Sequence, residues 1–228
     1  MDRRSFIKSS SLLSTGLVIG LGANSEIAIG AEAVNTGAWI RIGPDNSVTI
    51  NNARSEMGQD TYTTMAMLMV EELDYPLNKV KVEIAPANAI YINSLLGGQI
   101  TGGSTSVREA WDKLRLVGAT AKEQLKAAAA GKWGVAPESV KASQGVLTSG
   151  KNRATYGEMA NDANAIKITI TPQLKTPDQY RYIGKAFPRL DTPMKVNVTA
   201  TYGIDVRMQD MLVASLAQCP VIGGKVKS

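Results

Sequence analysis

Residues 101–130 read TGGSTSVREAWDKLRLVGATAKEQLKAAAA, and this stretch decides the fold. Apolar or small side chains recur every three or four positions from Val107 to Ala130, which predicts a long helix that packs along one face. Ser106 comes directly before that helix and Glu109 follows three residues later, which is the pattern of a capping box. We therefore expect Ser106 to accept a hydrogen bond from an amide of the first turn.

Shorter elements surround this helix. The sequence predicts a hairpin of strands at 39–42 and 48–51, a helix at 62–73 that stops before Pro76, and a strand at 80–84. Further along it predicts short strands near Val140 and Val146, a brief helix at 156–163 and a strand at 166–171. We therefore expect a mixed α+β fold, in which a small sheet and two or more packed helices form a first domain at 34–171.

The pattern loosens after residue 171. Four prolines spaced through a polar stretch predict a linker at 172–198. Beyond it, 202–206 and 211–216 have the composition of strands and would open a further domain at 199–228. Two strands cannot bury a face alone, so this second domain is expected to be incomplete or to depend on a partner.

The N-terminus has the order of an export signal. Arg3, Arg4 and Lys8 precede an uncharged stretch at 9–25, and small residues follow up to Ala33. The paired arginines resemble a twin-arginine signal, so residues 1–33 are predicted to be a cleaved signal peptide and the protein to be periplasmic. A membrane anchor is the alternative, but the stretch is too short and too polar to span about 30 Å of hydrocarbon.

Composition excludes most protein-ligated chemistry. The chain contains no histidine and a single cysteine, Cys219. This excludes a Ser-His-Asp triad, a Cys-His pair, a CxxC redox pair and a cysteine-ligated iron–sulfur cluster. The net charge of +5 is scattered rather than gathered in a basic stripe, so it does not indicate nucleic-acid binding. Any redox or hydrolytic function would therefore have to borrow its reactive atoms.

Two segments are candidates for a binding site, because each opens a predicted helix. Residues 56–60 precede the first helix and residues 101–106 precede the long one. Helix N-termini expose unpaired amides and the positive end of the dipole, and glycines let a ligand approach the backbone. Together the two starts could hold a phosphate-rich ligand. Ordinary helix capping by Ser, Thr and Asp is the alternative interpretation.

The same segments carry a family resemblance. Residues 55–73, SEMGQDTYTTMAMLMVEEL, and residues 101–108, TGGSTSVR, resemble the molybdopterin-binding large subunit of the xanthine dehydrogenase and aldehyde oxidase family. The resemblance is strongest to the isoquinoline 1-oxidoreductase beta-subunit branch, which also carries a twin-arginine leader. Residues 202–206 and 217–221 are similar to the opening of that family's hammerhead domain.

This resemblance implies a molybdenum hydroxylase that oxidises N-heterocycles or aldehydes with water as the oxygen source. Its cofactor would be molybdopterin cytosine dinucleotide, contacted here by Gly58, Gln59, Gly102, Gly103, Ser104, Thr105 and Ser106. No metal ligand is expected from the chain. The partners implied are a small [2Fe-2S] subunit and a small-molecule substrate, and a cytochrome c is one candidate electron acceptor.

Two departures from the family pattern limit what is expected. Asp60 stands where a third glycine is commoner; it could cap the helix, but its charge would be unfavourable beside a pyrophosphate. The family's general-base glutamate lies near the end of a much longer chain, so no catalytic residue is assigned here. Glu71 and Glu72 are expected on a solvated helix face instead. The alternative function is a non-catalytic exported module that binds a phosphate-bearing ligand or another subunit, and a third is a plain structural domain.

Overall fold

A computed structural model of the chain describes residues 16–21, 27–29, 38–169 and 171–225. The chain divides into two compact units, residues 1–191 and 192–228. Each unit is described by itself below.

The first unit is built on a five-stranded sheet in the order β2-β1-β3-β4-β5. Its strands are β1 (Leu17–Leu21), β2 (Ile27–Ile29), β3 (Ile40–Ile42), β4 (Val48–Asn52) and β5 (Lys81–Ile84). All neighbours are antiparallel except β4 and β5, which are parallel. The expected hairpin is confirmed by the pairing of Ile40 with Ile50 and of Ile42 with Val48.

The first two strands of the sheet, β1 and the edge strand β2, were not expected. The sequence assigned residues 17–21 and 27–29 to the signal peptide, whereas the structure pairs them as β1 and β2 and places β1 beside β3. Leu17 and Ile19 are fully buried. Residues 1–15, 22–26 and 30–33 of the predicted leader lie outside the described residues. The signal peptide therefore stays a prediction.

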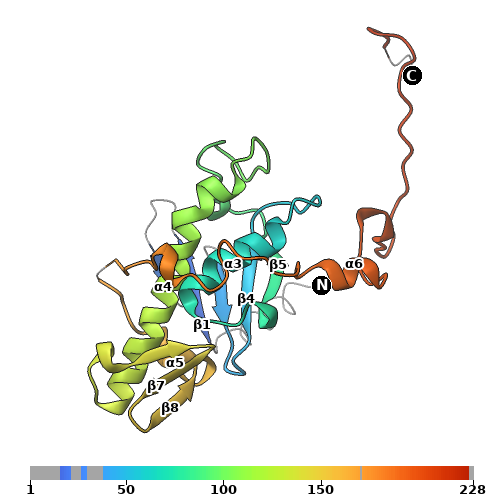
Figure 1. The fold of residues 1–228 in the computed structure, drawn as a ribbon. Helices are drawn as coiled ribbons and strands as arrows, with labels where there is room; N and C mark the ends of the chain where they lie inside the picture. The colour runs from blue at the N-terminus through green and yellow to red at the C-terminus, as the bar shows by residue number, and fades with distance from the viewer. Residues whose placement is uncertain (1–15, 22–26, 30–37, 170, 226–228) are drawn as a thin grey trace. The chain divides into compact units, whose positions relative to one another are not determined.

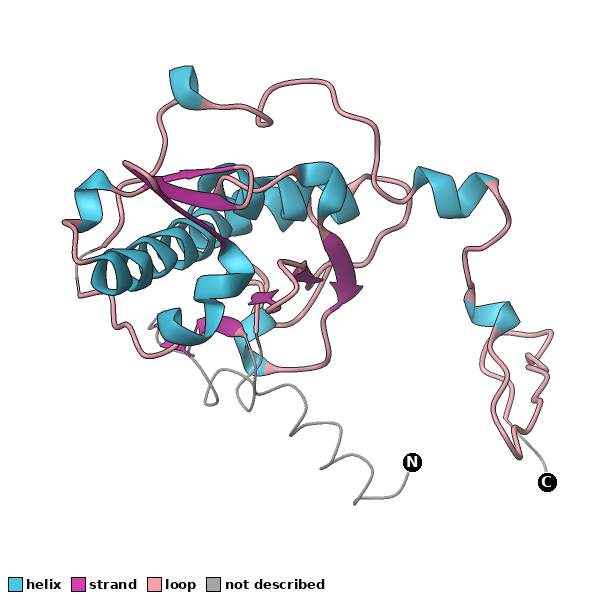
Figure 2. Cartoon of the chain, turned by 90° about the horizontal axis from the view of Figure 1, so that it is seen from below, coloured by secondary structure: helices cyan, strands magenta, loops and turns pink. Residues whose placement is uncertain are grey.

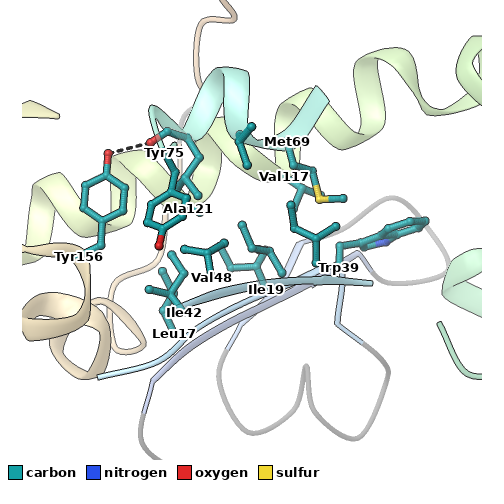
Figure 3. Close-up of a cluster of buried hydrophobic side chains, with 14 of the residues drawn as sticks. Leu17, Ile19, Trp39, Ile42, Val48, Met69, Tyr75, Val117, Ala121 and Tyr156 are labelled. Carbon is teal, nitrogen blue, oxygen red and sulfur yellow. Dashed lines mark hydrogen bonds between the residues drawn. The ribbon is translucent and has the colours of Figure 1, made fainter. Parts of the chain in front are cut away.

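Two helices, α3 (Thr61–Leu73) and α4 (Ser106–Trp133), lie side by side over one face of this sheet (Figure 1). The core forms between them and the strands, where Leu17, Ile19, Ile42 and Val48 point from the sheet toward Met69 (Figure 3). Leu17 and Ile19 are two residues apart in β1, and Ile42 pairs across the sheet with both Leu17 and Val48, so the four side chains share one face.

The helices cross closely at Gly118 of α4. A Cβ atom there would lie 2.1 Å from the carbonyl oxygen of Met69. Only a glycine at position 118 allows the backbones of α3 and α4 to pack this closely.

A second, three-stranded antiparallel sheet contains β6 (Lys141–Ser143), β7 (Val146–Ser149) and β8 (Asn152–Thr155). It leads into α5 (Tyr156–Ala163), which begins with a complete capping box between Thr155 and Glu158. Short 3₁₀ turns η1 (Leu77–Lys79), η2 (Ala89–Tyr91), η3 (Pro137–Ser139) and η4 (Pro177–Gln179) connect the other elements. The mixed α+β fold with a small sheet and packed helices is thus confirmed.

Two local predictions were wrong. The capping box at Ser106 does not form, because α4 begins at Ser106 itself and Glu109 instead pairs with Arg54 at 2.7 Å. The strand expected at 166–171 is absent from its described residues, 166–169 and 171, which are irregular. Alternating isoleucines there suggested a strand, but alternation alone supplies no neighbouring strand with which to pair.

The segment expected as a linker, 172–198, is divided by the structure. Its first part up to Asp191, here called the strap (residues 172–191), belongs to the first unit. The strap is held by buried carboxylates: Glu71 accepts hydrogen bonds from the backbone N–H groups of Arg181, Tyr182 and Ile183. Residues 172–191 are therefore fastened along the first unit.

The second unit contains α6 (Thr192–Val196) and η5 (Gly203–Asp205), and Figure 2 shows it as loop with these two short helices. The prediction of strands at 202–206 and 211–216 was wrong, since the structure describes both ranges and has no strand in either. Leu212 and Leu216 are 92% and 84% exposed. These apolar residues have the composition of strands but no paired neighbour within residues 192–225.

Within the described ranges, no helix is both long enough and apolar enough to cross a membrane.

Candidate functional site

The two candidate segments lie next to each other in the structure. We call residues 55–60, between β4 and α3, the first loop, and residues 101–106, at the start of α4, the second loop. The backbone N–H of Ser55 donates to Thr101 Oγ1 at 2.9 Å, which joins one loop to the other. The two helix starts therefore lie in one region, and their binding of a ligand stays a prediction.

A buried arginine fixes this junction. Arg54 donates to the carbonyl oxygen of Tyr91 at 2.9 Å and to Glu109 Oε2 at 2.7 Å. The side chains of Arg54 and Glu109 are only 2% and 3% exposed. Because Glu109 lies in the first turn of α4, this ion pair connects the end of β4 to the start of the long helix.

The N-terminus of α3 is already occupied by a carboxylate. Glu56 Oε1 accepts from the N–H groups of Gly58 at 2.8 Å and Asp60 at 3.1 Å, and its Oε2 accepts from Tyr62 at 2.9 Å. Partial burial opposes ionisation of Glu56, but these amides outweigh it, so the pKa of the carboxyl is lowered. Glu56 therefore already occupies the N–H of Tyr62 in the first turn of α3 and two amides of the loop before it.

Asp60 does not cap the helix with its side chain. It is the N-cap residue, in a left-handed conformation with φ of 68°, and it makes no side-chain cap hydrogen bond within the described chain. The capping role expected of Asp60 belongs instead to Glu56. Glu56 was missed because it lies four residues before the cap, outside the spacing of a capping box.

Gln59 braces its own loop. Its Oε1 accepts from the N–H of Met57 at 2.6 Å and its Nε2 donates to the carbonyl oxygen of Ser55 at 2.8 Å. Gln59 and Gly58 are nevertheless exposed. In this conformation the first loop therefore presents a closed, exposed turn whose shape depends on the Gln59 amide.

The second loop is more open. Gly102, Gly103 and Ser104 are exposed, whereas Thr105 is buried and donates from Oγ1 to the carbonyl oxygen of Gly102 at 2.8 Å. Thr105 is the N-cap, and within the described chain no side chain caps this end of α4. The amides of a first helical turn have no partner inside the helix, so those beginning at Ser106 remain available to an outside acceptor.

Gly102 offers a test of whether this loop fits a phosphate-bearing group. Its φ lies outside the left-handed region, and no described atom lies within 4 Å of a Cβ built on it. Neither backbone strain nor packing within the chain therefore requires a glycine here. The space beside Gly102 therefore leaves room for a group from outside the chain, and the second loop is compatible with a phosphate-bearing group at the start of α4.

A pocket of about 250 Å³ lies beside the first loop. Its lining includes Asn52, Arg54 and Ser55. Among the described residues, Asn52 Nδ2 and Arg54 Nε have no hydrogen-bond partner. The region therefore has an excess of donors, which suits an acceptor-rich ligand.

The carboxylates of α3 were misjudged from the sequence. Glu71 and Glu72 are fully buried rather than solvated. Glu72 pairs with Arg115 at 2.7 Å, and Glu71 pairs with Lys175 at 3.2 Å. Both hold other parts of the chain, which leaves neither free for acid–base chemistry.

No group of three or more potential metal ligands occurs in the part of the chain that the structure describes.

Comparison with known proteins gives a consistent result. The profile of the molybdopterin cofactor-binding domain matches residues 9–208. The chain is 30% identical over 265 residues to the isoquinoline 1-oxidoreductase subunit beta of Brevundimonas diminuta, covering 98% of this chain and 34% of the relative. It is 29% identical over 245 residues to the membrane-bound aldehyde dehydrogenase (pyrroloquinoline-quinone) of Gluconacetobacter polyoxogenes, covering 100% of this chain and 31% of that protein.

A solved structure of reconstituted CO dehydrogenase from Oligotropha carboxidovorans is similar at a TM-score of 0.44 and 19% identity, over 75% of this chain and 23% of that one. The chain spans about a third of the length of the two curated relatives. The family resemblance drawn from the first and second loops is confirmed by the profile match, which includes both. The chain belongs to the molybdopterin cofactor-binding domain family.

Proposed function

We propose that this chain is the part of a molybdenum-dependent oxidoreductase that binds molybdopterin cytosine dinucleotide through the first and second loops. The observation that carries the proposal is the family match over residues 9–208, because it spans both loops. The uncapped start of α4 and the unconstrained Gly102 support it. Backbone N–H groups at a helix start are suited to phosphate oxygens.

The two loops have different roles in this proposal. Gly102, Gly103, Ser104 and the first turn from Ser106 would bind the phosphates, while the buried Thr105 holds the backbone of that loop in place through Gly102. In the first loop, Gln59 keeps the turn closed. The bound cofactor would supply molybdenum on its own dithiolene sulfurs for a two-electron oxidation, so the absence of histidine is no obstacle.

The proposed reaction is the hydroxylation of an N-heterocycle or an aldehyde, with water as the oxygen source. The names of two relatives, an isoquinoline oxidoreductase and an aldehyde dehydrogenase, support these two classes. Glu56, Glu71 and Glu72 are each engaged with internal donors, and none is proposed as the base. We expect residues 1–228 alone to show no turnover.

Electrons from molybdenum would leave through a small [2Fe-2S] subunit. The sequence has a single cysteine, so this chain cannot ligate such a cluster with cysteines. A cytochrome c is the proposed further acceptor.

Export to the periplasm through the twin-arginine pathway is proposed from the leader pattern at 1–33. The proposal competes with the fold for residues 17–21, since cleavage at Ala33 would remove β1 from the edge of β3. The mass of the mature protein decides between them. A first residue near 34 supports export with cleavage, and an intact N-terminus opposes it.

Cofactor analysis of the full-length protein, purified from its native host, tests the binding function. We expect molybdenum and, after acid hydrolysis, CMP in amounts comparable to the protein. Absence of both overturns the proposal, and recovery of pyrroloquinoline quinone, the cofactor in the name of the Gluconacetobacter relative, would replace it.

Variants separate binding from simple helix capping. We expect Gln59→Ala and Ser104→Ala to lower molybdenum content more than they lower the melting temperature. Ser139→Ala is the matched control, because Ser139 is exposed and its hydroxyl pairs with Ser149 beside the second sheet. Full loading of both loop variants, together with lost stability, would favour the capping-only interpretation.

A further inference from the structure

Arg189, in the strap, reaches the first loop from more than a hundred residues away in sequence. Its Nη1 donates to the carbonyl oxygen of Gly58 at 2.8 Å, and its Nη2 donates to Glu56 Oε1 at 3.0 Å. Its Nε lies 3.5 Å from Asp60 Oδ1. One guanidinium therefore contacts the loop at three of its residues.

A carboxylate behind Arg189 orients the guanidinium. Asp191 accepts from Arg189 Nε at 3.0 Å and from Nη2 at 2.9 Å, which is a two-point contact. The planar guanidinium of Arg189 can contact Asp191 and the first loop at the same time, and a lysine ammonium cannot reproduce this geometry. The side chain of Asp191 is 2% exposed, so the orienting group is itself fixed.

We propose that Arg189 is a positioning residue, which holds the first loop in its binding conformation beside the cofactor phosphates. This inference rests on the function proposed above. Asp60, which stands where the family commonly has glycine, lies near the same guanidinium.

The strap has other attachments, so Arg189 is not needed merely to keep it in place. The backbone N–H of Leu190 donates to Thr63 Oγ1 at 3.1 Å. Farther along, Lys175 pairs with Glu71 at 3.2 Å and with Asp74 at 2.7 Å. Loss of the Arg189 side chain would leave these contacts, and its effect would fall on the first loop.

The test compares Arg189→Gln, Arg189→Lys and Lys175→Met in the full-length protein purified with its cofactor. The matched control is Lys175→Met, because it weakens the strap away from the first loop. Molybdenum and CMP content, their retention during dialysis, and hydrogen exchange of residues 55–60 are measured for each. Hydrogen exchange reports on the loop without depending on activity.

For Arg189→Gln we expect roughly tenfold weaker retention of molybdenum, the fold-change that corresponds to about 1.4 kcal/mol of lost binding free energy. We also expect faster exchange at residues 55–60. Arg189→Lys should fall between Arg189→Gln and the wild type, because it keeps the charge and loses the fork. Lys175→Met should retain cofactor normally.

Wild-type retention and wild-type exchange in Arg189→Gln would overturn the inference. Equal losses in Arg189→Gln and Lys175→Met would also overturn it, since the effect would then belong to the strap as a whole. If the wild-type protein contains neither molybdenum nor CMP, the proposed function fails. Faster exchange at residues 55–60 would then still show that Arg189 holds the loop. If Arg189→Gln does not fold, Arg189→Lys gives the same comparison.

Discussion

Replacement of Gly118 by alanine tests the contact that holds α3 against α4. The new Cβ would lie 2.1 Å from the carbonyl oxygen of Met69, about 1.3 Å short of the 3.4 Å at which ordinary contact begins. The obstacle is backbone, so no side-chain rotation relieves it, and the helices must move apart. Overpacking of this kind costs about 1–3 kcal/mol, and alanine returns about 1 kcal/mol of helix propensity. Taking the upper end, we expect Gly118→Ala to lower the free energy of unfolding by about 2 kcal/mol.

The same helix provides the control. Gly131 is exposed, and no described atom lies within 4 Å of a Cβ built there. Gly131→Ala should therefore raise the free energy of unfolding by about 0.5–1 kcal/mol through propensity alone. Urea unfolding followed by circular dichroism measures both variants, read as shifts in midpoint at constant slope. A Gly118→Ala protein as stable as the wild type, alongside a stabilised Gly131→Ala, would refute the close-crossing argument.

Three further predictions concern stability. Glu71→Gln should lower the free energy of unfolding, measured by urea titration, by about 3 kcal/mol, because the backbone N–H groups of residues 181–183 lose their charged acceptor. Burial alone would raise the pKa of Glu71, but its hydrogen bonds outweigh burial and lower the pKa. The free energy of unfolding of the wild type should therefore fall as the pH drops below about 4.5, and it should fall less steeply in Glu71→Gln. Thr155→Ala should cost about 1 kcal/mol and Ser106→Ala less than about 0.5, since α5 begins with a complete capping box and the expected one at α4 does not form; equal costs would contradict this. A chain beginning at residue 34 should lose about 3–6 kcal/mol from unburied Leu17 and Ile19; an unchanged unfolding midpoint would show that β1 contributes nothing.

Elements with a local signal were predictable from the sequence. The β3–β4 hairpin, α3, β5, α4 and α5 each have their own periodicity and their own turn or cap residues. β1 and β2 were missed because an apolar stretch after basic residues has the same pattern in a signal peptide as in a strand. Only the pairing of Leu17 with Ile42, across the predicted cleavage position, distinguishes the two.

Long-range contacts decided most of what the sequence missed. Glu71 and Glu72 look solvated because two adjacent carboxylates on a helix usually are, and their partners lie far along the chain, at Lys175 and Arg115. Arg54 and Arg189 carry no motif at all. Their importance to the candidate site follows only from the ion pairs with Glu109 and Glu56.

The sequence could place a ligand at two helix starts but could not choose between them, because the same residue types cap helices and bind anions. The structure separates the two starts. At α3, Glu56 already supplies a negative charge to the amides of residues 58, 60 and 62, so a phosphate there would displace it or be repelled by it. At α4, the hydroxyl of Thr105 donates to the carbonyl oxygen of Gly102 and does not cap the first turn. An anionic ligand is therefore favoured at α4. The single positive charge of Arg189 faces the carboxylates of Glu56, Asp60 and Asp191, so the first loop keeps a net negative charge, which is a further reason for phosphates to lie at α4 rather than at α3.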